Sequence, residues 1–168
     1  MLKHPVPDEI LARIGDITVS FALLESVIQT LASSQIQDDQ RIGQIITAEL
    51  SFRNLRALTM SLYRERHGED GDYDELRELM KRASDVEGLR NQITHSVWGA
   101  GETAETVTRI KTTAKEKQGL RFSFVKVSAD DLGAVAEEIL QLGGDVQGFW
   151  IRLIEAGKAI NDPSVRLW

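Results

Sequence analysis

The stretch Leu89-Arg90-Asn91-Gln92-Ile93-Thr94-His95-Ser96-Val97-Trp98 closes a long amphipathic pattern around which the chain is organised. The apolar positions of that pattern recur at alternating steps of three and four residues, at Leu76, Leu79, Ala83, Val86, Ile93 and Val97. This spacing places them on one side of a helix, so the sequence predicts a buried helix over residues 75–98. Arg90 occupies one position of the apolar side. Because a long charged side chain is seldom buried alone, we expect Arg90 to meet a carboxylate inside the fold or to face a cleft between subunits.

Comparable patterns predict three further long helices. Two precede the central helix, over residues 8–31 and 38–66, and one follows it from Ser128 to about residue 160. Ser128 and Asp131 have the spacing of a capping box, which starts a helix. The apolar rhythm then continues in phase through Gly143-Gly144, which favours one helix over two.

The segment between the third and fourth helices has a different residue pattern. Residues 106–113 and 120–127 are rich in β-branched and aromatic side chains with partial alternation, which predicts a β-hairpin inserted at about residues 104–127. Two strands alone are marginally stable, so we expect them to lie against the helices. The predicted fold is therefore all-α, an elongated antiparallel four-helix bundle with a small hairpin between helices three and four, forming one domain over residues 1–168.

Composition limits the classes of function. A chain of 168 residues is about one domain in length, and the absence of Cys excludes disulfides, thiolate metal sites and Cys nucleophiles. A net charge of -6 argues against nucleic-acid binding over the whole surface but not over a local basic patch. No apolar run reaches the roughly 18 residues of a membrane span and the start lacks a signal-peptide pattern, so we expect a cytoplasmic protein. Apolar surface in excess of what one bundle buries suggests a homodimer.

Arg90, Asn91 and His95 are the residues whose chemistry fits cleavage of a phosphodiester. Metal-free cleavage of RNA needs proton transfer, which suits His, and a cation to hold the phosphate, which suits Arg. Residues five apart lie about 140° apart on an ideal helix, so Arg90 and His95 do not share one side unless two copies of the stretch meet at a two-fold axis. The structural alternative is a helix-end His95, an Arg90 paired with a core carboxylate such as Glu25, and a solvated Asn91.

Four long helices with Arg-Asn-x-x-x-His near the end of the third, here Arg90-Asn91-Gln92-Ile93-Thr94-His95, resemble the HEPN superfamily of helical ribonucleases and nucleotide-binding proteins. The resemblance implies a dimer that brings two Arg-x(4–6)-His motifs into one metal-independent endoribonuclease site, with Arg90, Asn91 and His95 as catalytic residues and no cofactor. It further implies a toxin or an antiviral or stress-response ribonuclease, partnered by an antitoxin or a regulatory protein. The inserted hairpin departs from the family pattern.

Five cations concentrate in the predicted hairpin of this acidic protein: Arg109, Lys111, Lys115, Lys117 and Arg121. Such a cluster predicts contact with an RNA backbone, whereas its alternative role is to keep a hairpin tip in solution. Two classes of function therefore stay open. One is a ribonuclease, and the other is a non-catalytic dimeric helical module that binds a partner protein or a nucleotide.

Overall fold

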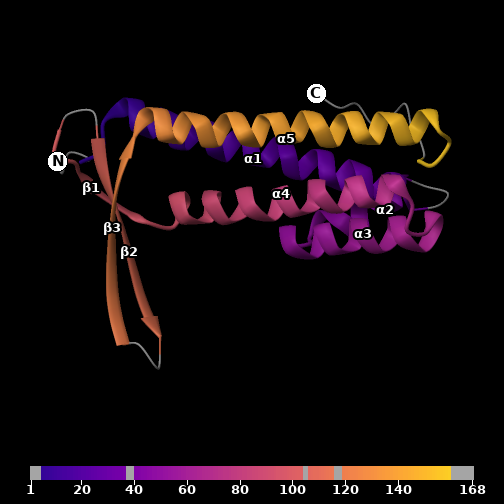
Figure 1. Cartoon of the computed structure of the whole chain (residues 1–168), viewed down its shortest axis with the longest axis horizontal. Coiled ribbons are helices and arrows are strands. Elements are labelled where there is room, and N and C mark those ends of the chain that lie inside the picture. The colour runs from indigo at the N-terminus through magenta and orange to yellow at the C-terminus, as the bar shows by residue number, and fades with distance from the viewer. Residues whose placement is uncertain (1–4, 37–39, 104–105, 116–118, 160–168) are drawn as a thin grey trace. The chain divides into compact units, whose positions relative to one another are not determined.

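The computed structural model describes residues 5–36, 40–103, 106–115 and 119–159. In this part of the chain five helices accompany a three-stranded antiparallel sheet (Figure 1). In chain order the elements are α1 (Asp8–Ser34), α2 (Gln40–Ala48), α3 (Phe52–His67), α4 (Gly71–Thr94), β1 (Val97–Ala100), β2 (Thr106–Lys115), β3 (Gly119–Ser128) and α5 (Ala129–Glu155). None of the helices in these ranges combines the length and apolarity required to cross a bilayer.

The chain divides into two compact units. Unit 1 comprises Met1–Phe21 and Val86–Glu138, and unit 2 comprises Ala22–Asp85 and Ile139–Trp168. The long helices α1, α4 and α5 each contribute residues to both units. Each unit buries its own set of apolar side chains.

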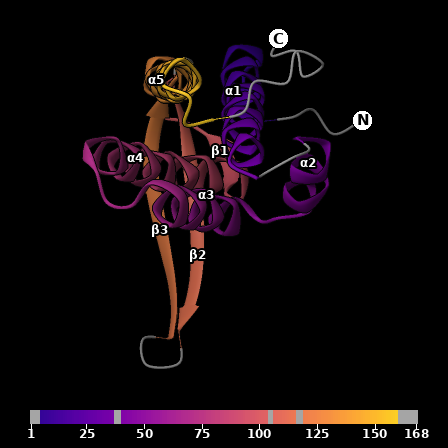
Figure 2. The same cartoon turned by 90° about the vertical axis from the view of Figure 1, so that its right-hand side faces the viewer.

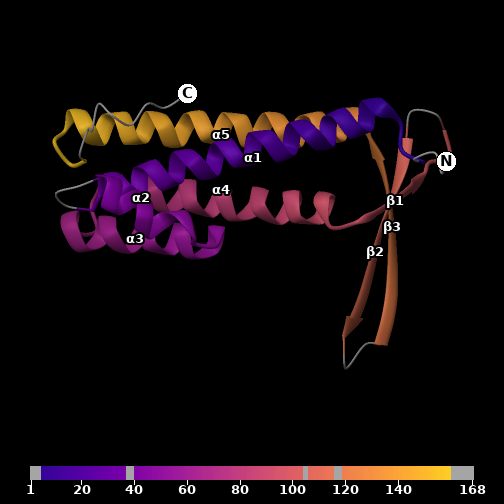
Figure 3. The ribbon, with the colours of Figure 1, turned by 180° about the vertical axis from the view of Figure 1, so that it is seen from behind.

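Unit 1 is built on the sheet, whose strand order is β1-β2-β3. β1 pairs only with Val107–Ile110 of β2, whereas β3 pairs with the full length of β2, so the outer part of the β2–β3 hairpin extends beyond β1 (Figure 3). The core of this unit gathers buried side chains from α1, α4, β2 and α5: Ile10, Ile17, Phe21, Val86, Ile93, Val107, Leu132 and Ala136.

The two faces of the sheet differ in chemistry. Cross-strand partners lie on the same face and successive residues alternate, so the register places Arg109, Lys111 and Arg121 together on the face that carries the buried Val107. The opposite face is apolar and exposed. Its side chains include Val97, Leu120, Phe122 and Phe124, which are 57% to 66% exposed.

Unit 2 contains α2, α3 and the remaining parts of α1, α4 and α5. α3 runs alongside α4 in two perpendicular views (Figures 1 and 2). Fully buried apolar residues from the four longer helices form its core: Leu24, Ile28, Leu31, Leu55, Leu76, Ile139, Leu142 and Val146. α2 is short and keeps Ile42, Ile45 and Ile46 exposed.

A polar network in unit 2 joins the residues after α5 to the α3–α4 connection. The Lys158 ammonium donates to the Asp70 carboxylate at 2.8 Å and also bonds Asp72, while the buried Tyr63 hydroxyl donates to Asp70 at 3.1 Å. The bond from Lys158 lowers the pKa of Asp70 to about 2, helped by the Tyr73 backbone N–H, which donates to the same carboxylate at 2.9 Å. Burial raises the pKa of Tyr63 to about 12.

The prediction of a four-helix bundle with only a hairpin is wrong in two places. The expected helix over residues 38–66 is two helices, because the chain turns after Ala48 and Ser51 starts α3 as its N-cap, accepting a bond from the Asn54 backbone N–H at 3.3 Å. The expected helix over residues 75–98 ends at Thr94, and Val97–Ala100 pairs with β2 as a third strand. A β-branched Val97 next to Trp98 and Gly99 is better suited to a strand than to another helical turn.

Other predictions about the elements are confirmed. α5 is one helix through Gly143-Gly144, and its start has the reciprocal bonds of a capping box. Ser128 Oγ accepts from the Asp131 backbone N–H at 3.2 Å, and Asp131 Oδ2 accepts from the Ser128 backbone N–H at 2.9 Å. The Ser128 backbone N–H and the Ser128 hydroxyl, which donate to the Asp131 carboxylate at 2.9 and 2.7 Å, lower the pKa of Asp131. At the start of α4 the N-cap is Asp70, whose Oδ1 accepts from the Tyr73 backbone N–H at 2.9 Å.

Candidate functional site

A pocket of about 330 Å³ in unit 1 lies where α4 ends and faces β2. We call it the α4–β2 pocket. Its lining comes from the last turns of α4, the turn into β1, and β2: Gly88, Asn91, Gln92, His95, Ser96 and Lys111. The pocket thus contains two of the three predicted catalytic residues, Asn91 and His95, together with one of the predicted RNA-binding cations.

His95 is the first residue beyond α4. Its backbone N–H donates to the Asn91 carbonyl at 3.1 Å, which extends the helical hydrogen bonding by one residue and fixes the position of the His95 backbone. The His95 side chain is exposed, whereas Asn91, one turn earlier, is half-buried. A ligand in the pocket can therefore reach both the imidazole and the amide.

The turn from α4 into β1 is held by side chains that satisfy the last carbonyls of the helix. The Trp98 indole N–H donates to the Ile93 carbonyl at 3.1 Å, and Ser96 Oγ donates to the Gln92 carbonyl at 2.5 Å. Carbonyls at a helix C-terminus have no partner within the helix, so these bonds stabilise the change from helix to strand. His95 consequently sits on a backbone that is constrained on both sides.

Arg90 does not line the pocket. Its guanidinium carbon lies 4.3 Å from the centroid of the buried Phe21 ring, which is a cation–π contact, and its Nη1 donates to Asn91 Oδ1 at 2.9 Å. Within the described part of unit 1 it forms no ion pair with a carboxylate. The Phe21 ring thus accommodates the guanidinium on the apolar side of the helix. The hydrogen bond from Arg90 orients the Asn91 amide, although Arg90 itself does not line the pocket.

The predicted RNA-binding cations differ in their surroundings. Lys111 is exposed and lines the pocket. Arg109 is half-buried, and its Nη1 donates to Gln92 Oε1 at 3.1 Å, so it connects β2 to the end of α4. Arg121 is exposed on the same face of the sheet. Lys115 is the last residue of β2, and Lys117 lies outside the described residues.

The lining residues Gly88, Gln92 and Ser96 were not among the predicted site residues. Gly88 and Asn91 are one turn apart, and a Cβ built at Gly88 would meet no atom within 4 Å, so a small side chain would fit there without moving a neighbour. The spacing Gly88, Asn91, Gln92, His95 follows the three-four rhythm of one side of a helix. That rhythm in polar residues is a signal that sequence reading could have used.

Chemically, the α4–β2 pocket combines an imidazole, two amides, a hydroxyl and an ammonium. Imidazole is the side chain best suited to proton transfer near neutral pH, and an ammonium binds anions as a point charge. Among the lining residues, His95 is the one able to act as a general acid or base near neutral pH. The arrangement suits a ligand that carries a phosphate and whose reaction requires proton transfer.

No known family model, no curated protein and no solved structure matches this chain.

Proposed function

We propose that this chain is a metal-independent endoribonuclease whose active site is the α4–β2 pocket, as the resemblance of its Arg90-to-His95 motif to HEPN ribonucleases implies. The single observation that carries the proposal is that His95, Asn91 and Lys111, from two elements separated in sequence, line one pocket. Proton transfer, hydrogen bonding and phosphate binding are the three functions that transesterification of RNA requires.

The reaction uses the substrate's own nucleophile. The ribose 2′-oxygen attacks the adjacent phosphorus, the 2′-O–P bond forms, and the P–O5′ bond breaks. The proton of the 2′-hydroxyl leaves to a base and another proton reaches the departing 5′-oxygen, so the products are a 2′,3′-cyclic phosphate and a free 5′-hydroxyl. His95 performs proton transfer, and Lys111 balances the charge of the phosphate.

Two proton transfers are required, and the pocket of one chain provides a single imidazole among its lining residues. A homodimer in which the Arg90-to-His95 stretches of two copies meet at a two-fold axis would supply His95 twice. We therefore propose a C2 dimer. We also propose that an antitoxin or regulatory protein is a further partner and that the protein is cytoplasmic.

Arg90 acts in this proposal as a positioning residue. Its bond to Asn91 Oδ1 at 2.9 Å fixes the amide, and its contact with Phe21 fixes the guanidinium. This role differs from direct binding of the phosphate, because Arg90 is not among the residues that line the pocket.

The test is incubation of the purified full-length protein with mixed RNA in the presence of EDTA. We expect cleavage to continue, the products to carry 2′,3′-cyclic phosphates, and DNA of the same sequence to remain intact because it lacks the 2′-hydroxyl. The matched control is His67→Ala, which removes a different histidine, one whose Nε2 hydrogen-bonds Gln35 Oε1 at 3.1 Å in unit 2. Cleavage that stops with EDTA, or that persists in a folded His95→Ala variant, contradicts the mechanism.

The second candidate, a non-catalytic dimeric module that binds a partner protein or a nucleotide, is favoured by a different observation. Phe122 and Phe124 of β3 are 57% and 66% exposed, and large exposed apolar patches commonly mark interaction surfaces. This candidate gains if the protein is a stable dimer but leaves RNA intact under all conditions tested. A monomer at micromolar concentration in light scattering counts against both proposals.

A further inference from the structure

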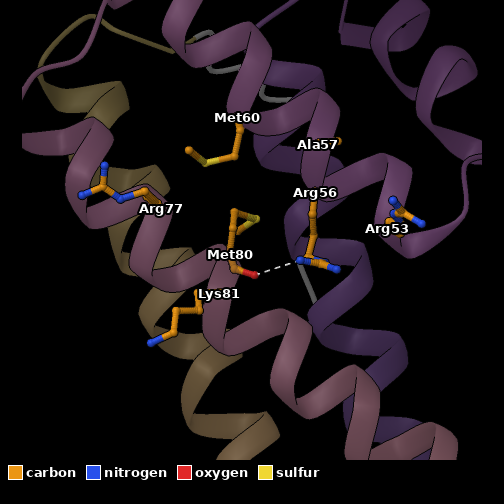
Figure 4. Close-up of a pocket in the computed structure, with 7 residues that line it drawn as sticks. All are labelled: Arg53, Arg56, Ala57, Met60, Arg77, Met80 and Lys81. Atoms are coloured by element: carbon orange, nitrogen blue, oxygen red, sulfur yellow. Dashed lines mark hydrogen bonds between the residues drawn. The ribbon is translucent and has the colours of Figure 1, made fainter.

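A second concave surface, in unit 2, lies between α3 and α4 (Figure 4). We call it the α3–α4 groove, and its volume is about 350 Å³. Four of its lining residues are cations, Arg53 and Arg56 from α3 and Arg77 and Lys81 from α4. No carboxylate lines the groove in the described structure, although the protein as a whole has a net charge of -6.

The cations are held to different degrees. Arg56 is fixed, because its Nη1 donates to the Met80 carbonyl at 3.1 Å and its guanidinium carbon lies 5.6 Å from the centroid of the Phe52 ring. Arg77 and Lys81 are exposed and form ion pairs with carboxylates one turn earlier on α4, at 2.9 and 3.3 Å. Exposed pairs of this kind contribute little in water, so a ligand can replace them at small cost.

The floor of the groove is apolar. Figure 4 shows the Met60 and Met80 side chains between the two helices, with the cations of α3 and α4 on either side. Met80 is 4% exposed and Met60 is half-buried. Methionine adapts its shape to apolar partners, which makes it common on surfaces that bind helices.

An apolar floor between two rows of cations requires a ligand with an apolar stripe and negative charges on both sides. A sugar–phosphate backbone provides charge without the apolar stripe. An amphipathic helix with Leu-type residues at i, i+3, i+4 and i+7 and carboxylates flanking them provides both. Such a helix would lie in the groove between two helices, as a third member of a helical layer.

We propose that the α3–α4 groove is a docking site for an acidic amphipathic helix of a partner protein. Arg53 and Arg56 would pair with carboxylates on one side of the docked helix, and Arg77 and Lys81 with carboxylates on the other. The inference is independent of the ribonuclease proposal, because it concerns residues of unit 2 and the α4–β2 pocket belongs to unit 1.

The test measures fluorescence anisotropy of labelled synthetic peptides with the full-length protein. The first peptide, about 18 residues long, carries a Leu stripe flanked by Glu, and two controls replace either Glu by Lys or Leu by Ser. We expect saturable binding of the first peptide, no binding of the Lys peptide, and at least about tenfold weaker binding of the Ser peptide, since one decade corresponds to loss of a modest apolar contact.

The location of binding is tested with Arg53→Glu/Arg77→Glu, two exposed positions on opposite sides of the groove. The matched control is Arg64→Glu, an exposed arginine of α3 that pairs with Glu69 at 2.8 Å and does not line the groove. We expect the double variant to lose at least about tenfold in affinity and the control to change less than about twofold.

Two results with the peptides overturn the proposal: no binding of the acidic Leu peptide, or equal binding of the Ser peptide. Two further results assign the groove to another ligand and also overturn it. The first is displacement of the peptide by a uridine oligonucleotide whose own binding needs Arg53 and Arg77, and the second is self-association of the chain that the double variant abolishes. RNA cleavage by the double variant is measured in parallel. If the double variant still cleaves RNA after it has lost peptide binding, the groove acts separately from the active site. Either proposal can then fail without the other.

Discussion

The α4–β2 pocket and the α3–α4 groove have nearly the same volume, about 330 and 350 Å³, but they are built for different chemistry. The pocket lies at a helix end, where the backbone turns from helix to strand and brings an imidazole, amides and one lysine together. The groove lies along the sides of two helices and is lined by four cations and two methionines, none of which exchanges a proton readily near neutral pH.

The two sites present their side chains in different ways. Along the side of a regular helix, side chains are presented at fixed spacing and can bind an extended partner. At the end of α4, Asn91 and His95 line one pocket with a strand residue, Lys111. Catalysis needs several different chemical groups close to the reacting atoms, whereas binding of an extended partner can use one kind of side chain repeated along a surface.

The largest expected effect separates the two regions directly. His95→Ala is expected to lower the rate of RNA cleavage by about 10² to 10⁴, the usual contribution of a general acid or base, with an unchanged melting temperature because the side chain is exposed. Arg53→Glu/Arg77→Glu is expected to leave the rate unchanged. Single-turnover cleavage of a labelled RNA in EDTA measures both, and equal losses in the two variants would remove the distinction between the regions.

Arg90→Ala is expected to reduce both stability and cleavage, because it removes the contact with Phe21 and the bond to Asn91. A cation–π contact and one hydrogen bond together contribute about 1 to 3 kcal/mol to the free energy of unfolding. Urea denaturation measures that loss. Arg64→Ala, which removes an exposed ion pair on α3, should change the free energy of unfolding by less than about 0.5 kcal/mol.

If Arg90 acts only through Asn91, Asn91→Ala should reproduce most of its effect on cleavage while retaining the contact between Arg90 and Phe21 and therefore most of the stability. A variant Asn91→Ala with normal cleavage would instead restore a direct role for Arg90 at the phosphate.

Lys111→Ala is expected to weaken RNA binding by about three- to tenfold and to reduce the slope of log affinity against log salt by about one, as loss of one phosphate contact would. The control is Lys126→Ala. Lys126 is paired with Thr108 across β2 and β3, so it lies on the opposite face of the sheet from Lys111. Titration of labelled RNA at several salt concentrations distinguishes them, and equal slopes for both variants would assign the basic hairpin to solubility.

The smallest expected effect concerns pH and the Asp70 network of unit 2. The pKa of Asp70 is about 2, below its ordinary value of 3.8, so the unfolded chain takes up this proton first as the pH falls. The stability that Asp70 contributes is therefore fully present above about pH 4 and is lost as the pH falls towards 2. Asp70→Asn should show a lower melting temperature at neutral pH and a smaller further decrease between pH 4 and 2. An identical pH dependence in both proteins would contradict this assignment.

The amphipathic rhythm was sufficient to predict the long helices. α1, α4 and α5 coincide closely with the stripes of apolar residues, and the capping pair Ser128 and Asp131 marks the start of α5 correctly. The two strands of the hairpin were also predictable, because runs of β-branched and aromatic residues with alternation have few other structures open to them. These features depend on side chains close together in sequence.

The two errors occurred where local preference was balanced. Residues 97–100 continue the apolar stripe of α4, yet they form β1 because β2 supplies a partner strand and Trp98 caps the Ile93 carbonyl. The rhythm also passes through residues 49–51, where a Ser51 cap separates α3 from α2. A stripe of apolar residues is satisfied equally by one helix or by two, so the stripe alone does not select between them.

By itself the sequence determined the helical and strand segments other than β1 and the break between α2 and α3, the absence of cysteine chemistry, and a set of candidate catalytic and RNA-binding residues that includes Asn91, His95 and Lys111. Only the tertiary structure decided that these three line one pocket, that Arg90 lies behind it on Phe21, and that cations of α3 and α4 form a groove. The physical reason is that local patterns are encoded by neighbours in the chain, whereas convergence of β2 on the end of α4 depends on strand register and helix ends, which distant residues set.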